Sequence, residues 1–253
     1  SWAIRWDKTI RSDRRFFSLT ATAYTRAPSN YALAANGIHH GTFRFEQGNP
    51  NLKPETAFEI RSSIKRSNYT NHLSLHANSF ASLHKGFIHL KPTASFAPVA
   101  HGGQIYAFQA TDAFRTGFEI DVNLERGKSL FKTNTSILGQ WSLETGLGLP
   151  FTPPLNLFNS YSYSIRDNLS LTFSHRVIAP SFILARNEDF TEGVSLLSFE
   201  LKLNSDKEGT FHFKIDNILN RSWLDHISAY RALGLVTQGR WWLLSWSKDL
   251  KNN

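Results

Sequence analysis

Hydrophobic and polar residues alternate along most of this chain. In residues 58–65, Phe58, Ile60 and Ile64 are apolar, and the positions between them are charged or polar. Residues 117–125 repeat the pattern, with apolar side chains at the even-numbered positions 118 to 124. Successive side chains of a β-strand point to opposite faces of the sheet. Each segment of this kind is therefore predicted to be a strand with one apolar and one polar face.

The alternation predicts eleven strands and very little helix. A single helical turn is expected near residues 30–35. The predicted strands cover residues 2–7, 15–25, 55–66, 71–84, 104–125, 129–142, 154–165, 169–178, 194–204, 209–218 and 238–250.

Short and long connections alternate between these strands. The short ones cover residues 7–14, 66–70, 125–128, 166–168 and 204–208, and the long ones cover residues 26–54, 85–103, 143–153, 178–193 and 220–237. An up-and-down antiparallel sheet with this order has all its long loops at one end. Transmembrane β-barrels show this asymmetry.

Two fold classes compete at this point. A soluble β-sandwich would turn the apolar faces into a core, whereas a transmembrane β-barrel would turn them to lipid. Many predicted strands reach the roughly 9–11 residues that a tilted membrane strand needs. Trp and Tyr also gather near strand ends, as at Trp2, Trp6 and Trp246, which is typical of the lipid interface. The pattern favours the barrel, and the sandwich stays open as the alternative.

Composition removes several function classes. The chain has 253 residues, 41% of them hydrophobic and 13% aromatic, and it has no cysteine and no methionine. Without cysteine, disulfide frameworks and cysteine nucleophiles are excluded. The formal charge of +8 is spread along the chain, so no nucleic-acid partner is expected. The usual nucleophile-elbow, phosphate-loop and zinc-protease motifs are absent, so no enzyme, catalytic residue or cofactor is predicted.

The ten histidines raise the question of a metal site. His39 and His40 are adjacent in the first long loop and are the weak candidates for metal ligands. Their simpler interpretation is as polar loop residues. Charged residues on the polar faces, such as Arg61 and Glu119, are similarly interpreted as a hydrated barrel wall with cross-strand pairs.

Residues 25–61 carry a more specific signal, TRAPSNYALAANGIHHGTFRFEQGNPNLKPETAFEIR. This stretch resembles a signature of TonB-dependent outer-membrane receptors. The matching positions are Arg26, Pro28, Asn36, Gly37, His39, Gly41, Thr42, Glu46, Gly48, Asn49, Leu52 and Glu55. Residues 106–122 are similar to a family strand that ends in Gly-x-Glu, and residues 213–246 resemble the family's closing segment.

The resemblance implies the C-terminal half of a 22-stranded barrel. Residues 1–253 would be one partial domain, about eleven strands, without the N-terminal plug domain and the first half of the barrel. The intact protein would lie in the bacterial outer membrane, against lipid, and contact TonB through its plug. It would bind and import an iron–siderophore, haem, cobalamin or another metal complex. The loop residues expected to contact ligand are Arg26, Asn36, His39, His40, Arg44 and Glu46.

The chain departs from the family pattern at its last strand and in its odd number of predicted strands, and one membrane alternative stays open. The family usually ends on an aromatic residue, whereas Leu250 takes that place here and Lys251, Asn252 and Asn253 follow it. A passive outer-membrane pore or an adhesin barrel would share the same pattern of strands. An eleven-stranded wall would also leave two unpaired edges, so the chain alone is not expected to form a working pore.

Overall fold

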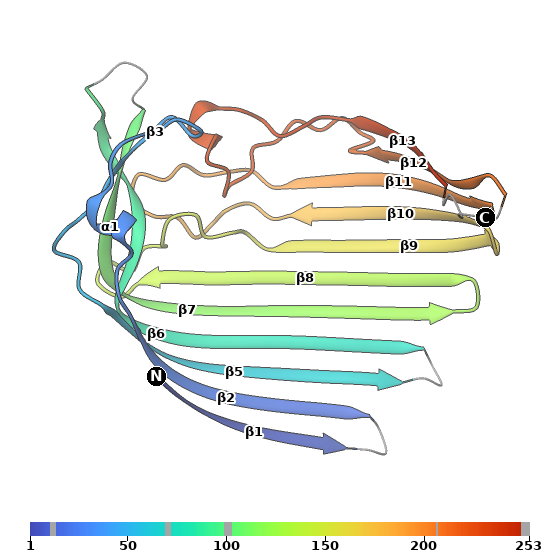
Figure 1. Cartoon of the computed structure of the whole chain (residues 1–253), viewed down its shortest axis with the longest axis horizontal. Coiled ribbons are helices and arrows are strands. Elements are labelled where there is room, and N and C mark those ends of the chain that lie inside the picture. The colour runs from blue at the N-terminus through green and yellow to red at the C-terminus, as the bar shows by residue number, and fades with distance from the viewer. Residues whose placement is uncertain (11–13, 69–71, 99–102, 206, 249–253) are drawn as a thin grey trace, which may run out of the picture.

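A computed structural model describes residues 1–10, 14–68, 72–98, 103–205 and 207–248. Eleven of the strands in these residues follow one another side by side, in chain order, within one sheet (Figure 1). They are β1 (Trp2–Ile10), β2 (Arg15–Arg26), β5 (Glu55–Asn68), β6 (Leu73–Phe96), β7 (Gln104–Arg126), β8 (Ser129–Ser142), β9 (Asn156–Arg166), β10 (Leu169–Ile178), β11 (Val194–Ser205), β12 (Gly209–Asp216) and β13 (Trp241–Ser247). The predicted all-β, up-and-down fold is confirmed. Leu250 and the residues after it lie outside the described part of the chain.

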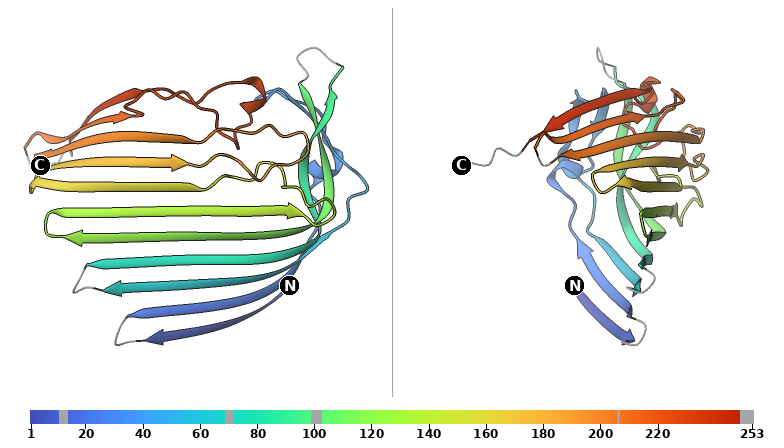
Figure 2. Two further views of the ribbon diagram at one scale, coloured as in Figure 1. Left: turned by 180° about the vertical axis from the view of Figure 1, so that it is seen from behind. Right: turned by 90° about the vertical axis from the view of Figure 1, so that its right-hand side faces the viewer.

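The sheet is curved and open. Within the described residues β1 pairs with β2 and β13 pairs with β12, and the two outer strands do not pair with each other. In the right-hand view of Figure 2 both outer strands lie to the left of the strands in the middle, so the sheet has the shape of part of a barrel wall. A sandwich would need two packed sheets, so the soluble alternative does not describe this fold.

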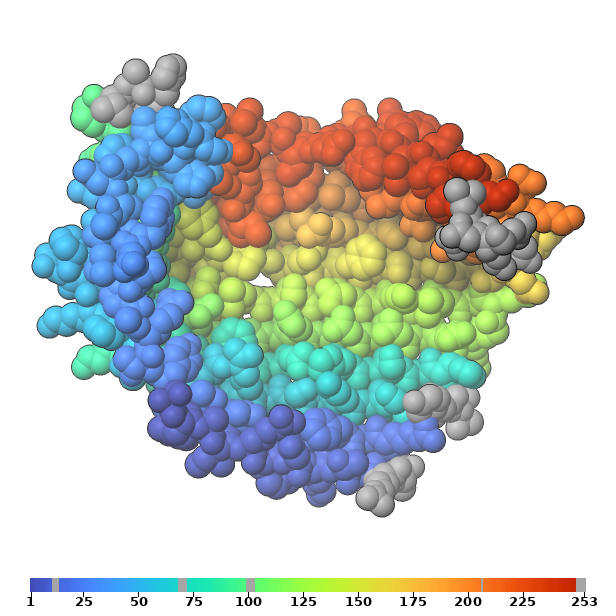
Figure 3. Space-filling view, viewed as in Figure 1, coloured from blue at the N-terminus to red at the C-terminus, as the bar shows by residue number. Residues whose placement is uncertain are grey.

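The two faces of the sheet differ as the alternation predicted. Phe58 lies opposite Leu83 across β5 and β6, and both side chains are exposed on the convex face. Glu59 lies opposite Ser82 on the concave face, which is the face seen in Figure 3. Large apolar side chains continue along the convex face to both edges and include Trp2, Ile4, Trp6, Leu19, Ile60, Phe118, Ile137, Phe173, Trp242, Leu244 and Trp246. A continuous exposed apolar surface of this extent is what a lipid-facing wall requires.

Strand β6 is much longer than predicted, with 24 residues, whereas β7, with 23 residues, agrees with its predicted range to within one residue. The long loop expected over residues 85–103 is wrong for most of its length, because β6 runs on to Phe96. The pairing shifts between His84 and Phe87, where Gly86 has a φ of +69°. This bulge interrupts the alternation, and beyond it the β6–β7 ribbon turns across one end of the sheet (Figure 1).

The first long loop is largely ordered as secondary structure. The predicted helical turn is confirmed as α1 (Asn30–Ala34), whose N-terminal Ala32 N–H is capped by Ser29 Oγ at 3.1 Å. A hairpin of β3 (Asn36–His39) and β4 (Arg44–Gln47) follows it, and β4 pairs in parallel with β7. This hairpin was not predicted, since strands of four residues are too short to show alternation.

The remaining long loops contain one more short helix, η2 (Arg231–Leu233). No helix in the described residues is long and apolar enough to cross a membrane. The first long loop, the β8–β9 loop (143–155), the β10–β11 loop (179–193) and the β12–β13 loop (217–240) all lie at the same end of the sheet (Figure 1). We call this the loop end.

Candidate functional site

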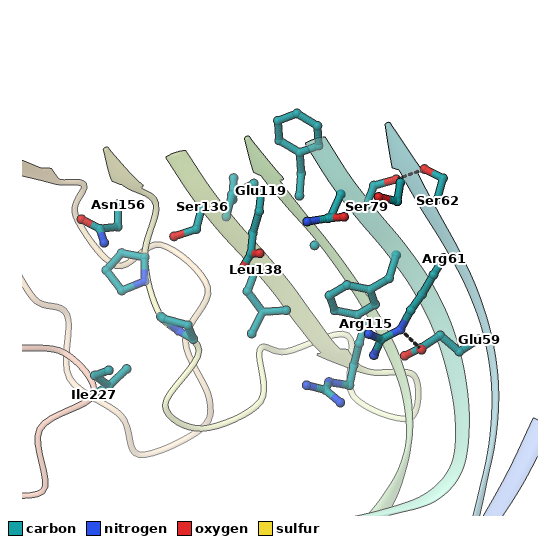
Figure 4. A pocket seen from close by; sticks show the side chains of 18 of the residues that line it. Glu59, Arg61, Ser62, Ser79, Arg115, Glu119, Ser136, Leu138, Asn156 and Ile227 are labelled. Atoms are coloured by element: carbon teal, nitrogen blue, oxygen red, sulfur yellow. Dashed lines mark hydrogen bonds and ion pairs between the residues drawn. The ribbon is translucent and has the colours of Figure 1, made fainter. Parts of the chain in front are cut away.

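Polar and charged side chains line the concave face of the sheet. They surround a hollow of about 980 Å³ that the loop end partly covers. Figure 4 shows Glu59, Arg61 and Arg115 on one side of it and Asn156 and Ile227 on the other. Further polar residues of the lining are Arg5, Ser18, Thr20, Ser63, Lys65, Asn78, Glu119, Ser136, Arg176, Asp225 and Thr237.

The charged groups of this wall are held by neighbours on the same or adjacent strands. Arg61 donates to Glu59, and its guanidinium lies 5.9 Å from the ring centre of Phe80. The Nε of Arg115 donates to Gln140 Oε1 at 2.8 Å, and that of Arg176 to Asn156 Oδ1 at 3.0 Å. Pairs of this kind fit a hydrated wall, with stabilisation of about 0.2–1 kcal/mol each.

The first long loop folds back onto α1. The N–H of Gly48 donates to the carbonyl of Ala35 at 2.5 Å, and the N–H of Asn49 donates to that of Ala32 at 2.8 Å. A Cβ on Gly48 would lie 2.6 Å from the Ala35 nitrogen, so the chain can approach this closely only at glycine. The Gly-Asn pair of the signature stretch therefore closes the end of the helix.

Glu55 links the same loop to the sheet. Its side chain is buried, and Oε2 accepts hydrogen bonds from Arg26 Nη2 and from the Ile88 N–H, both at 3.1 Å. The last β5–β6 pair at this end is Thr56 with Lys85, so Ile88 lies beyond the reach of the β5 ladder. The Glu55 carboxylate takes the place of the missing strand partner.

Two of the predicted ligand-contacting residues already have protein partners. Arg26, which is exposed, pairs with Glu55, with 3.0 Å between Nε and Oε1. Glu46 is buried and accepts a hydrogen bond from the Tyr31 hydroxyl. This bond raises the pKa of Tyr31 to about 12 because it favours the protonated phenol.

Arg44 joins the first long loop to the β8–β9 loop. Its guanidinium carbon lies 4.5 Å from the ring centre of Tyr106 and 4.8 Å from that of Phe151. Burial is the largest influence on the pKa of Arg44 and lowers it. The arginine Nε is buried and has no hydrogen-bond partner among the described residues, so the two rings are its principal contacts.

The other three predicted residues, Asn36, His39 and His40, are exposed on the β3–β4 hairpin. The Nδ1 of His39 lies 3.2 Å from Thr42 Oγ1. In the described part of the chain, no three His, Cys, Asp or Glu side chains gather in a group that could hold a metal ion. Of the six predicted residues, Arg26 ends β2, and the other five lie on the β3–β4 hairpin.

The structure also places a buried charged cluster at the loop end that the sequence did not point to. Glu188 has a fully buried side chain and accepts N–H bonds from Phe151 at 2.9 Å and Ala185 at 3.0 Å. Arg231 Nη2 lies 3.2 Å and His226 Nε2 lies 3.5 Å from Glu188 Oε1. The contributing residues come from three different long loops, so no local pattern in the sequence could have revealed their contact.

An open antiparallel sheet with an apolar convex face, a polar concave face and all long loops at one end is the wall of a transmembrane β-barrel. A family model described as "TonB dependent receptor-like, beta-barrel" matches residues 3–206. The chain belongs to this family, which is one of bacterial outer-membrane proteins. No curated protein sequence matches it at a significant level.

Solved structures with the same fold include the copper transporter OprC, at a TM-score of 0.79 and 14% identity over 95% of this chain and 38% of that one. The siderophore receptor PirA from Acinetobacter baumannii has a TM-score of 0.66 and 17% identity, over 94% of this chain and 39% of that one. The ferric-catecholate import receptor Fiu from K12 E. coli has a TM-score of 0.65 and 16% identity, over 96% of this chain and 34% of that one. The chain thus spans less than two-fifths of each of these proteins, and the likeness establishes the fold.

Proposed function

We propose that residues 1–253 form the C-terminal part of the barrel of a TonB-dependent receptor and lie in the bacterial outer membrane. The observation that carries this proposal is the sheet itself, because its convex face is apolar and its concave face is polar. Lipid would cover the convex face, and the polar face would line the barrel interior. The hydrogen-bonding groups at the free edges of β1 and β13 would be met by the other half of the barrel, since unpaired backbone groups in lipid cost several kcal/mol each.

The intact protein is proposed to bind a scarce nutrient at the loop end and import it without chemical conversion. Its ligand would be an iron–siderophore, haem, cobalamin or another metal complex, and import would be driven through TonB acting on an N-terminal plug. The similar structures include proteins described as a copper transporter and as siderophore receptors, which supports a metal complex without choosing one. Within the first long loop, Asn36, His39 and His40 are the exposed candidates for ligand contact, and Arg26, Arg44 and Glu46 complete the predicted set.

Binding by the intact receptor tests this proposal. Ferric catecholate and hydroxamate siderophores, haem, cobalamin and a copper complex would be offered to cells that express the receptor with and without active TonB. At least one ligand should bind, and its uptake should require TonB. Deleting residues 38–43 should weaken binding and leave insertion of the barrel into the outer membrane intact.

A milder variant separates ligand contact from loop folding. Asn36→Ala, His39→Ala and His40→Ala together change only exposed side chains of the hairpin. The control variant combines Asp167→Ala and Lys207→Ala, whose side chains are exposed at the opposite end of the sheet. Unchanged binding in both the deletion and the triple variant would refute the role of this loop.

A further inference from the structure

The buried cluster at the loop end connects three long loops through one carboxylate. Glu188 belongs to the β10–β11 loop and accepts the backbone N–H of Phe151, from the β8–β9 loop, at 2.9 Å. It also lies 3.2 Å from Arg231 Nη2, which belongs to the β12–β13 loop. We call Glu188, Phe151, Arg231 and His226 the loop clamp.

The clamp is a complete set of partners for a buried charge. The Glu188 side chain is 0% exposed, and its two oxygens receive two backbone N–H groups and one guanidinium N–H. A buried carboxylate is costly unless it is paired and hydrogen-bonded in this way. If any one loop moved away, it would leave the carboxylate or its own N–H group without a partner, so the loops are energetically coupled.

A second row of contacts fixes the β12–β13 loop in the same place. His226 is buried, with Nδ1 2.9 Å from Thr191 Oγ1, and its carbonyl accepts a hydrogen bond from Arg231 Nη1 at 2.7 Å. Thr191 in turn donates its N–H to Ser181 Oγ at 2.8 Å. The β10–β11 and β12–β13 loops therefore share one polar interior.

The clamp lies directly behind part of the hollow's lining. Asp225 and Ile227, the two neighbours of His226 in the chain, both line the hollow, as does Trp223. Ile227 lies across the hollow from Arg61 (Figure 4). Because His226 points into the clamp while its neighbours border the hollow, the clamp determines where that border stands.

The first long loop is attached to the same unit. Phe151, whose N–H donates to Glu188, is also one of the two rings that contact Arg44. The other ring is Tyr106 of β7, and the two ring centres are 6.0 Å apart. Through this stack the hairpin that carries the predicted ligand contacts joins the clamp.

We propose that Glu188 is a positioning residue, which holds the loops 143–155, 179–193 and 217–240 as one cooperative unit and so presets the ligand-facing border of the hollow. The coupling of the loops stands on the contacts above, whereas its consequence for ligand rests on the proposed function. Ligand would then meet a preformed border and would not have to order three loops separately, a saving in conformational entropy that favours binding.

Hydrogen exchange of the intact receptor, without ligand, tests the coupling. In Glu188→Ala, peptides from all three loops should exchange at least tenfold faster than in the wild type. Glu188→Gln keeps one acceptor oxygen and should give a smaller increase in the same three loops. Asp189→Ala removes the neighbouring exposed carboxylate and should leave all three unchanged. A peptide from β10 reports whether the sheet is still folded.

A distance measurement tests the effect on the hollow. This chain has no cysteine, so Ser136→Cys and Ile227→Cys introduce the only two thiols of residues 1–253, for spin labels on facing parts of the lining. Any cysteine elsewhere in the intact receptor is first replaced by serine. The distance distribution should be narrow in the otherwise unchanged receptor and broad when Glu188→Ala is added. Faster exchange confined to 179–193, an equal effect of Asp189→Ala, or an unchanged distribution would overturn the proposal. None of these readouts uses ligand, so their failure is distinct from a failure of the proposed function.

Discussion

Removing the carboxylate of Glu55 should expose how the first long loop is fixed to the sheet. In Glu55→Ala the Ile88 N–H loses its acceptor, which lies 3.1 Å away in the native structure. An unsatisfied buried donor costs about 1–3 kcal/mol. The lost ion pair with Arg26 adds little, since the Arg26 side chain is 60% exposed and such pairs contribute about 0–1 kcal/mol.

Amide hydrogen exchange around Ile88 measures this loss in the intact receptor. A change of 1–3 kcal/mol in local opening corresponds to exchange faster by about 5- to 150-fold. Glu55→Gln should have a smaller effect, because its amide oxygen can still accept the Ile88 N–H. Glu192→Ala, at an exposed carboxylate of another loop, is the control. Equal protection at Ile88 in the wild type and Glu55→Ala would show that the carboxylate is not the substitute for a strand partner.

Three further predictions concern the loops. Gly48→Ala should destabilise the first long loop by about 1–3 kcal/mol, because the added Cβ would overpack against α1. Gly37→Ala is the control and should be tolerated, because a Cβ there meets nothing within 4 Å. Amide hydrogen exchange of residues 30–35 measures the effect of both variants. The Tyr31–Glu46 hydrogen bond should give its full stabilisation below the ordinary tyrosine pKa of 10.0 and lose it as pH rises through about 12. The difference in free energy of unfolding between the wild type and Tyr31→Phe should therefore be constant below pH 10.0 and disappear as pH rises through about 12. Burial lowers the pKa of His226 below its ordinary 6.5, so the loop clamp should loosen as pH falls below that value. Protection factors in 217–240, which correct for the intrinsic pH dependence of exchange, should then fall, and His226→Gln should make them independent of pH.

The alternation of the sequence was sufficient to predict the sheet and its two faces. Phe58 and Ile60 are exposed on the convex side, and Glu59 and Arg61 line the hollow, as expected from their parity. The extension of β6 was missed because the bulge at Gly86 breaks the period of two. The alternation therefore ends near residue 84, whereas the strand continues to Phe96. A rule based on periodicity detects a strand only as long as its register is uninterrupted.

The loop clamp lay beyond sequence reasoning for a different reason. Phe151, Glu188 and Arg231 belong to three loops of irregular backbone, and their contacts depend on how the curved sheet brings its strand ends together. Nothing in the local sequence distinguishes Glu188 from its exposed neighbour Asp189. Burial alone separates them, and burial in a loop is a property of the whole fold.

The signature stretch divides into residues that build the loop and residues left free by it. Gly48 and Asn49 close the end of α1 through their backbone N–H groups, and Glu55 replaces a strand partner, so these positions are accounted for by folding. Glu46 is likewise occupied by Tyr31. A ligand that reached Glu46 would have to displace a protein hydrogen bond of a buried carboxylate, whereas Asn36, His39 and His40 are exposed on the hairpin. On the proposed function, ligand contact in this loop would therefore fall to the exposed hairpin, while the buried part of the signature keeps that hairpin in place.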